Sequence, residues 1–516
     1  MTLIQRWTLV ATIIGSGIVF LDGTIVNVAL PRIGRDLPAS ILGVLEGQTY
    51  IVSGYLAVLA ALLILAGALS DHYGRRRIFA IGLSLFGVTS VVCGLAPTLE
   101  LLVIARLFQG AAGALLVPGS LAIITNAFEG QQRARAFGIW AAATSALVVL
   151  GPITGGVLVD SVGWRAAFLV NVPLILVALF ALRHVAESRD TSGDGRFDWL
   201  GSLVATLAVG GLAFGVIRGE QKAWADPIAW IALAIGVISL VAFPILMAKR
   251  PHPLVPLELF RDRTFAAINL ATFFIYGALY ISQSYQGLLM QGVLGYTATA
   301  AGAIGLPAGI MLTLLSTRVG TLAGRIGSRG FLVAGPLIMA AGLLWYVRLP
   351  TDSAAWQATL GSPSTLIPPV DVLIDVLPAV LLFGLGIALI VAPLTSTLMN
   401  SVPTTRSGLG SAINNSISRV GAPLIGALIF IAISATFYSV LGSLTGLDTS
   451  SSDIRQAFPP LNPPRADATA LQLTAVRQAS VDAFHQAMLV SAALLGVGGA
   501  VSYLGLRGSK AAGEGT

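Results

Sequence analysis

Two long apolar segments are separated by the short polar stretch Gly67-Ala68-Leu69-Ser70-Asp71-His72-Tyr73-Gly74-Arg75-Arg76-Arg77. The apolar segments cover about residues 47–69 and 78–96, and each is long enough to cross a bilayer as a helix. The polar stretch is therefore predicted to lie at a membrane surface, as a loop between two transmembrane helices. Gly74 can take the positive φ that a tight turn between helices often needs.

The composition predicts a helical membrane protein. Apolar residues make up 55% of the 516 residues and charged residues only 10%, and the mean hydropathy is +0.86. So few charges cannot cover the surface of a soluble protein of this length. Repeated apolar runs of spanning length instead predict an all-α polytopic membrane protein.

The charge and the metal-binding residue types indicate topology rather than a ligand. A net charge of +7 would suggest nucleic acid in a soluble chain, but here the excess is expected in loops that flank the membrane. The single cysteine, Cys93, lies in an apolar run, and the four histidines show no ligand spacing. The sequence contains no Walker-type phosphate loop. We therefore expect no cofactor, no metal site, no enzymatic activity and no nucleic-acid partner.

Apolar runs recur along the whole chain and predict fourteen transmembrane helices. The seventh and eighth of them lie between two polar segments, residues 183–196 and 249–263. The predicted spans cover about residues 7–30, 47–69, 78–96, 101–127, 134–159, 166–182, 199–216, 228–247, 264–290, 297–317, 331–347, 372–398, 408–440 and 481–506.

The distribution of basic residues predicts the orientation. With both termini in the cytoplasm, nineteen of the thirty lysine and arginine residues fall on the cytoplasmic side, nine fall outside and two fall within spans. The positive-inside rule favours this orientation. We therefore predict a multi-pass protein of the cytoplasmic (inner) membrane with both termini in the cytoplasm.

An internal repeat predicts two bundles of six helices. Residues 320–329 repeat the glycine spacing of residues 67–76, and residues 383–393 repeat the spacing of residues 108–118. The predicted domains are an N-terminal bundle at 1–186, a two-helix insert with cytoplasmic flanking loops at 187–262, and a C-terminal bundle at 263–516.

The second bundle contains the only long external loop in this prediction, residues 443–480. The loop is rich in Ser, Pro and Asp, which predicts partial disorder. An alternative is that the loop gates an external mouth of the helix bundle.

The polar stretch resembles the loop signature of the major facilitator superfamily, Gly-x-Leu-x-Asp-x-x-Gly-Arg-Arg, at Gly67, Leu69, Asp71, Gly74, Arg75 and Arg76. Twelve core spans with a central pair resemble the fourteen-helix drug/proton antiporter branch. The resemblance implies the major facilitator fold and a role for this loop as a conformational switch. We expect Asp71 to face a helix N-terminus in the second bundle, where an anion is favoured, with Arg75 and Glu129 completing the charge set.

The first span contains an acid, Asp22, in the run Leu21-Asp22-Gly23-Thr24-Ile25-Val26-Asn27-Val28-Ala29-Leu30-Pro31. This run resembles the first-helix motif of the antiporter branch. A carboxylate inside a span is costly when it is ionised and unpaired, so Asp22 can take up a proton there. The resemblance implies a carrier that exchanges protons for substrate. The alternative is a structural aspartate that hydrogen-bonds the neighbouring backbone.

A second intramembrane charge, Arg106, lies in the fourth span in the run Arg106-Leu107-Phe108-Gln109-Gly110. The run is similar to the Arg-x-x-x-Gln-Gly motif of the superfamily, with one residue fewer. Because an arginine stays charged at physiological pH, Arg106 is expected to hold Asp22 ionised until a proton or a substrate changes the balance. Asp22 and Arg106 form the predicted proton-coupling pair. The alternative is an arginine that reaches the interface or binds backbone carbonyls.

The fifth span carries Gly151-Pro152-Ile153-Thr154-Gly155-Gly156, followed by Trp164, Arg165, Phe168 and Asn171 before the sixth span. Both runs resemble motifs of the antiporter branch, which implies antiport. Pro152 removes one helical hydrogen bond, and Gly151, Gly155 and Gly156 allow another helix to come close. The segment is either a bend for a rocking motion or a site of close packing.

Polar and aromatic residues are predicted to line a substrate cavity. In the second half, Tyr276, Tyr280 and Gln283 recur on one helix face, and Asn415 and Arg419 lie four apart. Packing between helices is the alternative role for such a stripe. No acid occurs in the span 264–290, so proton coupling is expected to depend on the first half alone. The complete set of predicted cavity residues is Asn27, Tyr55, Gln109, Tyr276, Tyr280, Gln283, Asn415 and Arg419.

The resemblance covers nearly all of the chain and implies a monomeric secondary transporter in membrane lipid. We expect it to export apolar or cationic drug-like compounds in exchange for protons. One alternative is a proton-coupled transporter of a single metabolite, such as an amino acid, a sugar or a siderophore. Another alternative is a lipid scramblase or a sensor that keeps the same fold without transporting a solute.

Overall fold

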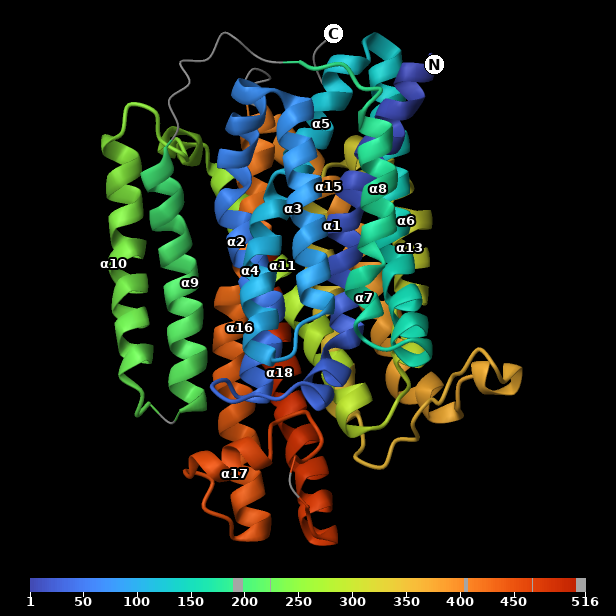
Figure 1. Cartoon of the computed structure of the whole chain (residues 1–516), viewed down its shortest axis with the longest axis vertical. Coiled ribbons are helices and arrows are strands. Elements are labelled where there is room, and N and C mark those ends of the chain that lie inside the picture. The colour runs from blue at the N-terminus through green and yellow to red at the C-terminus, as the bar shows by residue number, and fades with distance from the viewer. Residues whose placement is uncertain (189–197, 223, 403–406, 466, 507–516) are drawn as a thin grey trace. The chain divides into compact units, whose positions relative to one another are not determined.

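The computed structural model of the chain describes residues 1–188, 198–222, 224–402, 407–465 and 467–506 (Figure 1). All regular elements in these ranges are helices. Twelve helices are long and apolar enough to cross a membrane, and two shorter apolar helices, Ala146–Ser161 and Ala166–Leu182, lie where the fifth and sixth spans are predicted. The all-helical polytopic fold is therefore confirmed, whereas the count of fourteen spans is not.

The chain divides into two compact units. One unit comprises Met1–Leu212 with Ala232–Val255, and the other comprises Ala213–Ile231 with the chain from Pro256 onward. Each unit is a bundle in which long apolar helices bury their facing sides against one another.

The first unit contains the first six predicted spans. In it α1 packs along α6 and α8, and α2 packs along α4. Its helices are α1 (Leu3–Asp36), α2 (Val44–Tyr73), α3 (Arg75–Gly94), α4 (Leu99–Ala114), α5 (Leu116–Ala127), α6 (Gly130–Ser161), α7 (Ala166–Leu169) and α8 (Asn171–Leu182).

The fourth predicted span is two helices, α4 and α5, rather than one. The break lies at Leu115, whose backbone N–H bonds to the carbonyl of Ala112 in a tighter turn. Pro118 follows three residues later and has no N–H with which to bond to the preceding turn. Pro393, which has the same spacing in the second half, lies inside the continuous helix α15.

The second unit contains the remaining six core spans. In it α11 packs along α16 and α18, and α14 packs along α15. Its helices are α11 (Arg263–Leu288), extended by a π-helical turn (Leu289–Val293), α12 (Ala298–Ile304), α13 (Leu306–Ile326), α14 (Arg329–Trp345), α15 (Leu377–Asn400), preceded by a π-helical turn (Val372–Val376), α16 (Ser407–Thr445), α17 (Ser452–Ala457) and α18 (Ala470–Gly505).

The two helices of the predicted insert, α9 (Trp199–Gln221) and α10 (Pro227–Lys249), form a hairpin that the two units share. Near one end of α10, Met247 is buried with Leu65 of α2 and with Leu254. The residues between 213 and 231 instead belong to the second unit, where Arg455 donates a hydrogen bond of 2.5 Å to the carbonyl of Glu220. This division assigns residues 213–231 to the second unit and residues 232–255 to the first, and the predicted domain boundaries stay a prediction.

The segment 443–480, which is predicted to be external, contains helical residues at both of its ends and in between. Helix α16 continues to Thr445, α18 begins at Ala470, and α17 lies between them. Arg455 holds this segment, because its guanidinium donates to the Thr449 carbonyl at 2.9 Å and lies 4.6 Å from the ring centre of Tyr438. Phe458 is buried. The partial disorder of this segment stays a prediction.

The predicted polar loop between the second and third spans is a single residue. Helix α2 continues through Tyr73 and α3 begins at Arg75, so only Gly74 separates them. The φ of Gly74 is +108°, as the sequence predicts for a tight turn. Gly327, at the equivalent place between α13 and α14, has a φ of +94°. This pair of glycines agrees with the internal repeat.

Glu187 caps the N-terminus of α3, immediately after Gly74. Its two carboxylate oxygens accept hydrogen bonds from the backbone N–H groups of Arg76 (3.0 Å) and Arg77 (3.1 Å). The carbonyl of Ser188 accepts from the N–H of Arg75 at 3.0 Å. An acid at a helix N-terminus satisfies donors that have no partner within the helix and complements the helix dipole. The segment after α8 therefore fixes the turn.

Replacement of Gly74 and of Gly327 by alanine should destabilise the protein by different amounts. An alanine at this φ costs roughly 1–2 kcal/mol at either position. The Cβ of Gly74→Ala would also lie 2.8 Å from the carboxylate of Glu187, whereas the Cβ of Gly327→Ala meets no atom within 4 Å. We expect Gly74→Ala to lower the thermal unfolding midpoint of the detergent-solubilised protein more than Gly327→Ala does. Equal losses would show that the Glu187 cap does not constrain the turn.

Candidate functional site

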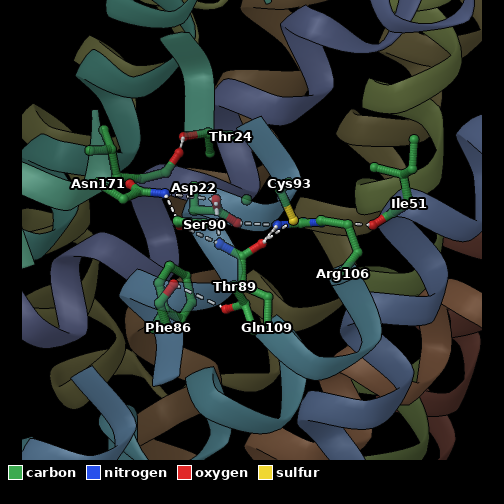
Figure 2. A network of polar contacts seen from close by, with 12 residues as sticks. Asp22, Thr24, Ile51, Phe86, Thr89, Ser90, Cys93, Arg106, Gln109 and Asn171 are labelled. Carbon is green, nitrogen blue, oxygen red and sulfur yellow. Dashed lines mark hydrogen bonds and ion pairs between the residues drawn. The ribbon is translucent and has the colours of Figure 1, made fainter. Parts of the chain in front are cut away.

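A buried acid lies at the centre of the first unit. Asp22 is in the middle of α1, and its side chain is fully buried, with 0% exposure. An ionised carboxylate inside a membrane bundle needs partners, because the surroundings do not solvate its charge. The partners of Asp22 come from three other helices, α3, α4 and α8, directly or through a shared hydrogen bond (Figure 2).

Arg106 of α4 neutralises this acid. Its Nη1 lies 2.5 Å from Asp22 Oδ2 and also donates to Gln109 Oε1 at 2.8 Å. Its Nε donates to the backbone carbonyl of Ile51 in α2 at 3.1 Å. Arg106 is only 1% exposed, so the pair is shielded from solvent on both sides. Removing one partner of such a pair leaves the other charge buried without compensation.

Two aromatic rings face the guanidinium. The Cζ atom of Arg106 lies 4.1 Å from the ring centre of Tyr55 and 5.8 Å from that of Phe168. Both distances are within the range of cation–π attraction, which is stronger where water is excluded. These rings orient the planar guanidinium towards Asp22.

Two side-chain amides bind the second carboxylate oxygen. Asp22 Oδ1 accepts from Gln109 Nε2 at 3.3 Å and from Asn171 Nδ2 at 3.0 Å. The same two amide nitrogens donate to Ser90 Oγ, at 2.8 and 3.1 Å. Each carboxylate oxygen of Asp22 thus receives at least one donor, which is the arrangement that an ionised carboxylate needs.

Helical spacing explains why these side chains converge. Arg106 and Gln109 are three residues apart on α4, so they lie on the same face of the helix. On α3, Ser90 and Cys93 have the same spacing, and Cys93 Sγ donates to Gln109 Oε1 at 3.5 Å. Phe168 on α7 and Asn171 at the start of α8 are also three residues apart.

Helix α6 packs against α1 beside this network. A Cβ atom on Gly151 would lie 2.0 Å from Thr24 Oγ1, and one on Gly155 would lie 3.1 Å from Ile25 Cα. Gly156 is buried, and Pro152 lies inside the helix. The expected antiporter helix is therefore in close contact with the segment that carries Asp22.

The residues of the predicted switch do not belong to the Asp22 network, and they lie on α2, α3 and α6. Gly67 lies within α2, Arg75 and Arg76 form the start of α3, and Glu129 is the exposed N-cap residue of α6. The side chain of Asp71 lies outside the described part of the structure. Glu187, which binds this turn, is a residue that the sequence analysis missed.

The predicted cavity residues separate into two groups. Tyr55 and Gln109 are buried partners of Arg106 and Asp22. Asn27 lies on α1 and donates to the carbonyl of Gly23 at 3.1 Å.

The second unit holds the other predicted cavity residues. On α11 the rings of Tyr276 and Tyr280 are 6.2 Å apart, and Gln283 is exposed. On α16 Asn415 donates to the carbonyl of Ser411 at 3.1 Å, and Arg419 is buried.

Three members of the network were not predicted as site residues: Ser90, Cys93 and Asn171. Asn171 is part of the motif quoted around Trp164, but the motif does not indicate which side chain the asparagine contacts. Nothing in the sequence near Ser90 distinguishes it from other serines in transmembrane helices. In the described part of the chain, no group of three or more His, Cys, Asp or Glu residues is placed to hold a metal ion.

Glu46 is a second buried acid, at the start of α2. Its Oε2 accepts from the N–H of Gly43 at 2.9 Å and so caps the helix. Glu100 at the start of α4 has a similar role, because its Oε1 accepts from the N–H groups of Ser40 and Ile41. These carboxylates stabilise the turns at this end of the bundle.

The chain matches a model of the Major Facilitator Superfamily over residues 12–427. The multidrug resistance protein Stp of Mycobacterium tuberculosis is 35% identical over 442 residues, which cover 84% of this chain and 77% of the relative. The puromycin resistance protein pur8 of Streptomyces alboniger is 32% identical, with 82% and 80% covered. The tetracenomycin C resistance and export protein of Streptomyces glaucescens is also 32% identical, with 81% and 74% covered.

Solved structures agree on the fold. A bacterial homolog of the human lysosomal transporter Spinster, inward-facing and unoccupied, matches with a TM-score of 0.65 and 17% identity over 98% of this chain and 97% of that chain. The D-xylose–proton symporter matches with a TM-score of 0.55 and 16% identity, over 82% of this chain and 89% of that one. At these identities the likeness concerns the fold alone.

The contact between α1 and α6 predicts a position-specific effect of bulk. We expect Gly151→Val to lower the free energy of unfolding by about 1–3 kcal/mol, because the new side chain overlaps Thr24. Gly210→Val is the control, since a Cβ on Gly210 in α9 meets no atom within 4 Å. The thermal unfolding midpoints of both purified variants measure the difference. The contact is refuted if Gly151→Val is as stable as Gly210→Val.

Proposed function

The chain belongs to the major facilitator superfamily and is a transporter rather than an enzyme, and from this premise we propose that it exports drug-like compounds in exchange for protons. The compounds are apolar or cationic small molecules. The names of the relatives, which include multidrug resistance and antibiotic export proteins, support this substrate class.

The buried pair of Asp22 and Arg106 is the observation that carries the proposal. Asp22 is the proton site, and Arg106 stabilises its ionised form. A proton on Asp22 cancels the charge that Arg106 neutralises, so protonation weakens the bond between α1 and α4. A carrier uses such a change to make its empty and loaded states move differently.

The membrane arrangement is part of the proposal. The twelve long apolar helices, together with the two shorter apolar helices in the first unit, support fourteen spans and the fourteen-helix branch. An even number of spans brings both termini to the same side, and the positive-inside rule favours the cytoplasm. The protein is then a monomer in the cytoplasmic membrane with Gly74 and Glu187 at the cytoplasmic surface.

Within each unit, polar residues that do not belong to the Asp22 network are the candidates for substrate contact. The first unit contributes Asn27. The second contributes Tyr276, Tyr280, Gln283, Asn415 and Arg419. The α2–α3 turn, with Asp71, Arg75 and Arg76, is the proposed switch that responds to substrate and proton.

The variant Asp22→Asn tests whether proton coupling can be lost while substrate binding is kept. Asparagine mimics a permanently protonated carrier, so uphill export driven by a proton gradient should be lost. Counterflow of substrate down its own gradient should remain, because binding and rocking do not require ionisation. Both are measured in proteoliposomes with a drug such as ethidium. Asp36→Asn is the control, since Asp36 is on the same helix but pairs with Arg32 at the surface.

Full uphill export by Asp22→Asn would place the proton site elsewhere. Counterflow of one metabolite but of no drug would favour the metabolite transporter. Failure of the wild-type protein to exchange any solute in a broad panel would favour the scramblase or the sensor.

The variant Arg106→Ala tests the role of Arg106 as the counter-charge of Asp22. Without the guanidinium, the ionised carboxylate of Asp22 is buried without a counter-charge, so the neutral carboxyl is favoured over the ionised one. The pH optimum of export should therefore move upward relative to the wild type. Arg32→Ala is the matched control, because Arg32 forms an exposed pair. An optimum that is unchanged or lower in an inserted, folded Arg106→Ala protein contradicts the assignment.

A further inference from the structure

We propose that Asn171 detects the protonation of Asp22 by turning its side-chain amide over. In the ionised state the amide nitrogen donates to Asp22, and in the protonated state the amide oxygen accepts from the new O–H of Asp22. This inference rests on the proposed function of Asp22 as the proton site. It assigns a positioning role to a residue on α8.

Among the described residues, only the nitrogen of the Asn171 side-chain amide has hydrogen-bond partners. Its Nδ2 donates to Asp22 Oδ1 at 3.0 Å and to Ser90 Oγ at 3.1 Å (Figure 2). Its Oδ1 is buried and has no hydrogen-bond partner among the described residues. Asn171 itself is 0% exposed, so solvent does not supply that partner. A buried amide oxygen without a donor costs free energy, and a structure keeps such a group for a reason.

The other groups around Asp22 are already occupied. Gln109 Oε1 accepts from Arg106 Nη1 at 2.8 Å and from Cys93 Sγ at 3.5 Å. Ser90 Oγ accepts from the amides of both Gln109 and Asn171. Of the two amides, only that of Asn171 has an acceptor to offer when Asp22 gains a proton.

The change in hydrogen bonds at Asn171 requires only the proton that binds to Asp22. A proton bonds to Asp22 Oδ1, where the ionised oxygen accepted from Asn171 Nδ2. The new O–H is a donor and cannot face another donor, so the Asn171 amide turns about its Cβ–Cγ bond and presents Oδ1. The NH₂ group and the oxygen of an amide are similar in size, so the turn needs little additional volume.

Rotation of the Asn171 amide changes the hydrogen bonds between α8 and α3. Nδ2 leaves Ser90 Oγ, so the hydrogen bond between α8 and α3 is lost. The protonated state therefore holds α8 less firmly against α3. Asn171 is the first residue of α8, directly after the break at Val170 between α7 and α8. The change is therefore located where the chain is already interrupted.

The titratable and charged groups around Asp22 come from three helices. They are Arg106 on α4, Cys93 on α3 and Tyr55 on α2, which itself faces Arg106. Helix α8 contributes the neutral amide of Asn171, and α6 contributes Gly151 next to Thr24. Of the two side-chain amides that contact Asp22, only that of Asn171 has an oxygen without a hydrogen-bond partner among the described residues.

Infrared difference spectroscopy of the full-length protein in lipid tests the proposal. A step from alkaline to acidic pH should produce the C=O band of protonated Asp22, which is identified by its absence in Asp22→Asn. An O–H that donates to an amide lowers the frequency of this band. In Asn171→Leu the band should move to higher frequency. Asn414→Leu is the matched control, because Asn414 is another buried asparagine, bonded to Asn269 and Thr272 in the second unit.

A second measurement uses the unmodified protein and does not depend on whether Asn171→Leu folds. With asparagine labelled with ¹³C in its side-chain carbonyl, the wild-type protein should show an amide band that shifts downward at acidic pH as Oδ1 gains a donor. Asp22→Asn should abolish this pH-dependent shift.

The outcomes distinguish this inference from the proposed function. If the wild-type protein shows no Asp22 carboxylic band at any pH, the proposed function fails. If that band appears but the labelled amide band does not change with pH, the amide turn is refuted while proton binding stands. An Asp22 band of equal frequency in the wild type and in Asn171→Leu refutes it as well.

Discussion

The first unit depends on one electrostatic constraint, which is that two opposite charges inside the bundle must neutralise each other. Asp22 and Arg106 are both almost completely buried, and their contact joins α1 to α4. The cost of leaving either charge alone is several kcal/mol, which is a large part of the stability of a typical protein. The surrounding residues follow from this constraint. Tyr55 and Phe168 flank the guanidinium, and Gln109 and Asn171 bind the remaining carboxylate oxygen.

The polar network and the helix contacts around it have different roles. Glycines on α6 allow it to pack closely against α1. The hydrogen bond that Trp140 of α6 donates to Ser16 Oγ of α1, at 2.8 Å, does not involve Asp22. The hydrogen bonds of the Asp22 network connect α1 with α4 and α8, and both of these helices with α3. In the proposed function, a proton on Asp22 changes these hydrogen bonds and leaves the steric contacts in place. This combination suits a carrier, whose bundle must stay intact while its state changes.

The turn between α2 and α3 has a separate physical basis. It is a single glycine at positive φ, and its neighbouring helix N-terminus is bound by Glu187 from a segment more than a hundred residues away in sequence. The stretch that first identifies the fold in the sequence is thus held by a residue outside that stretch. A glycine at positive φ recurs at Gly327, where a Cβ would meet no atom within 4 Å.

The sequence by itself determined the helical membrane fold and the positions of nearly all the helices. It also showed that the predicted spans contain an acid and an arginine. These properties depend on local composition and on hydrophobic length, which a single segment carries. The sequence did not determine the breaks at Leu115 and Val170 or the contacts of Arg455. It also did not determine the partners Ser90, Asn171 and Glu187. Those depend on which side chains from distant segments meet, and helical periodicity gives the face of each helix but not its neighbour. Only the tertiary structure decided that two side-chain amides, those of Gln109 and Asn171, bind Asp22. It also decided that the amide oxygen of Asn171 has no hydrogen-bond partner among the described residues.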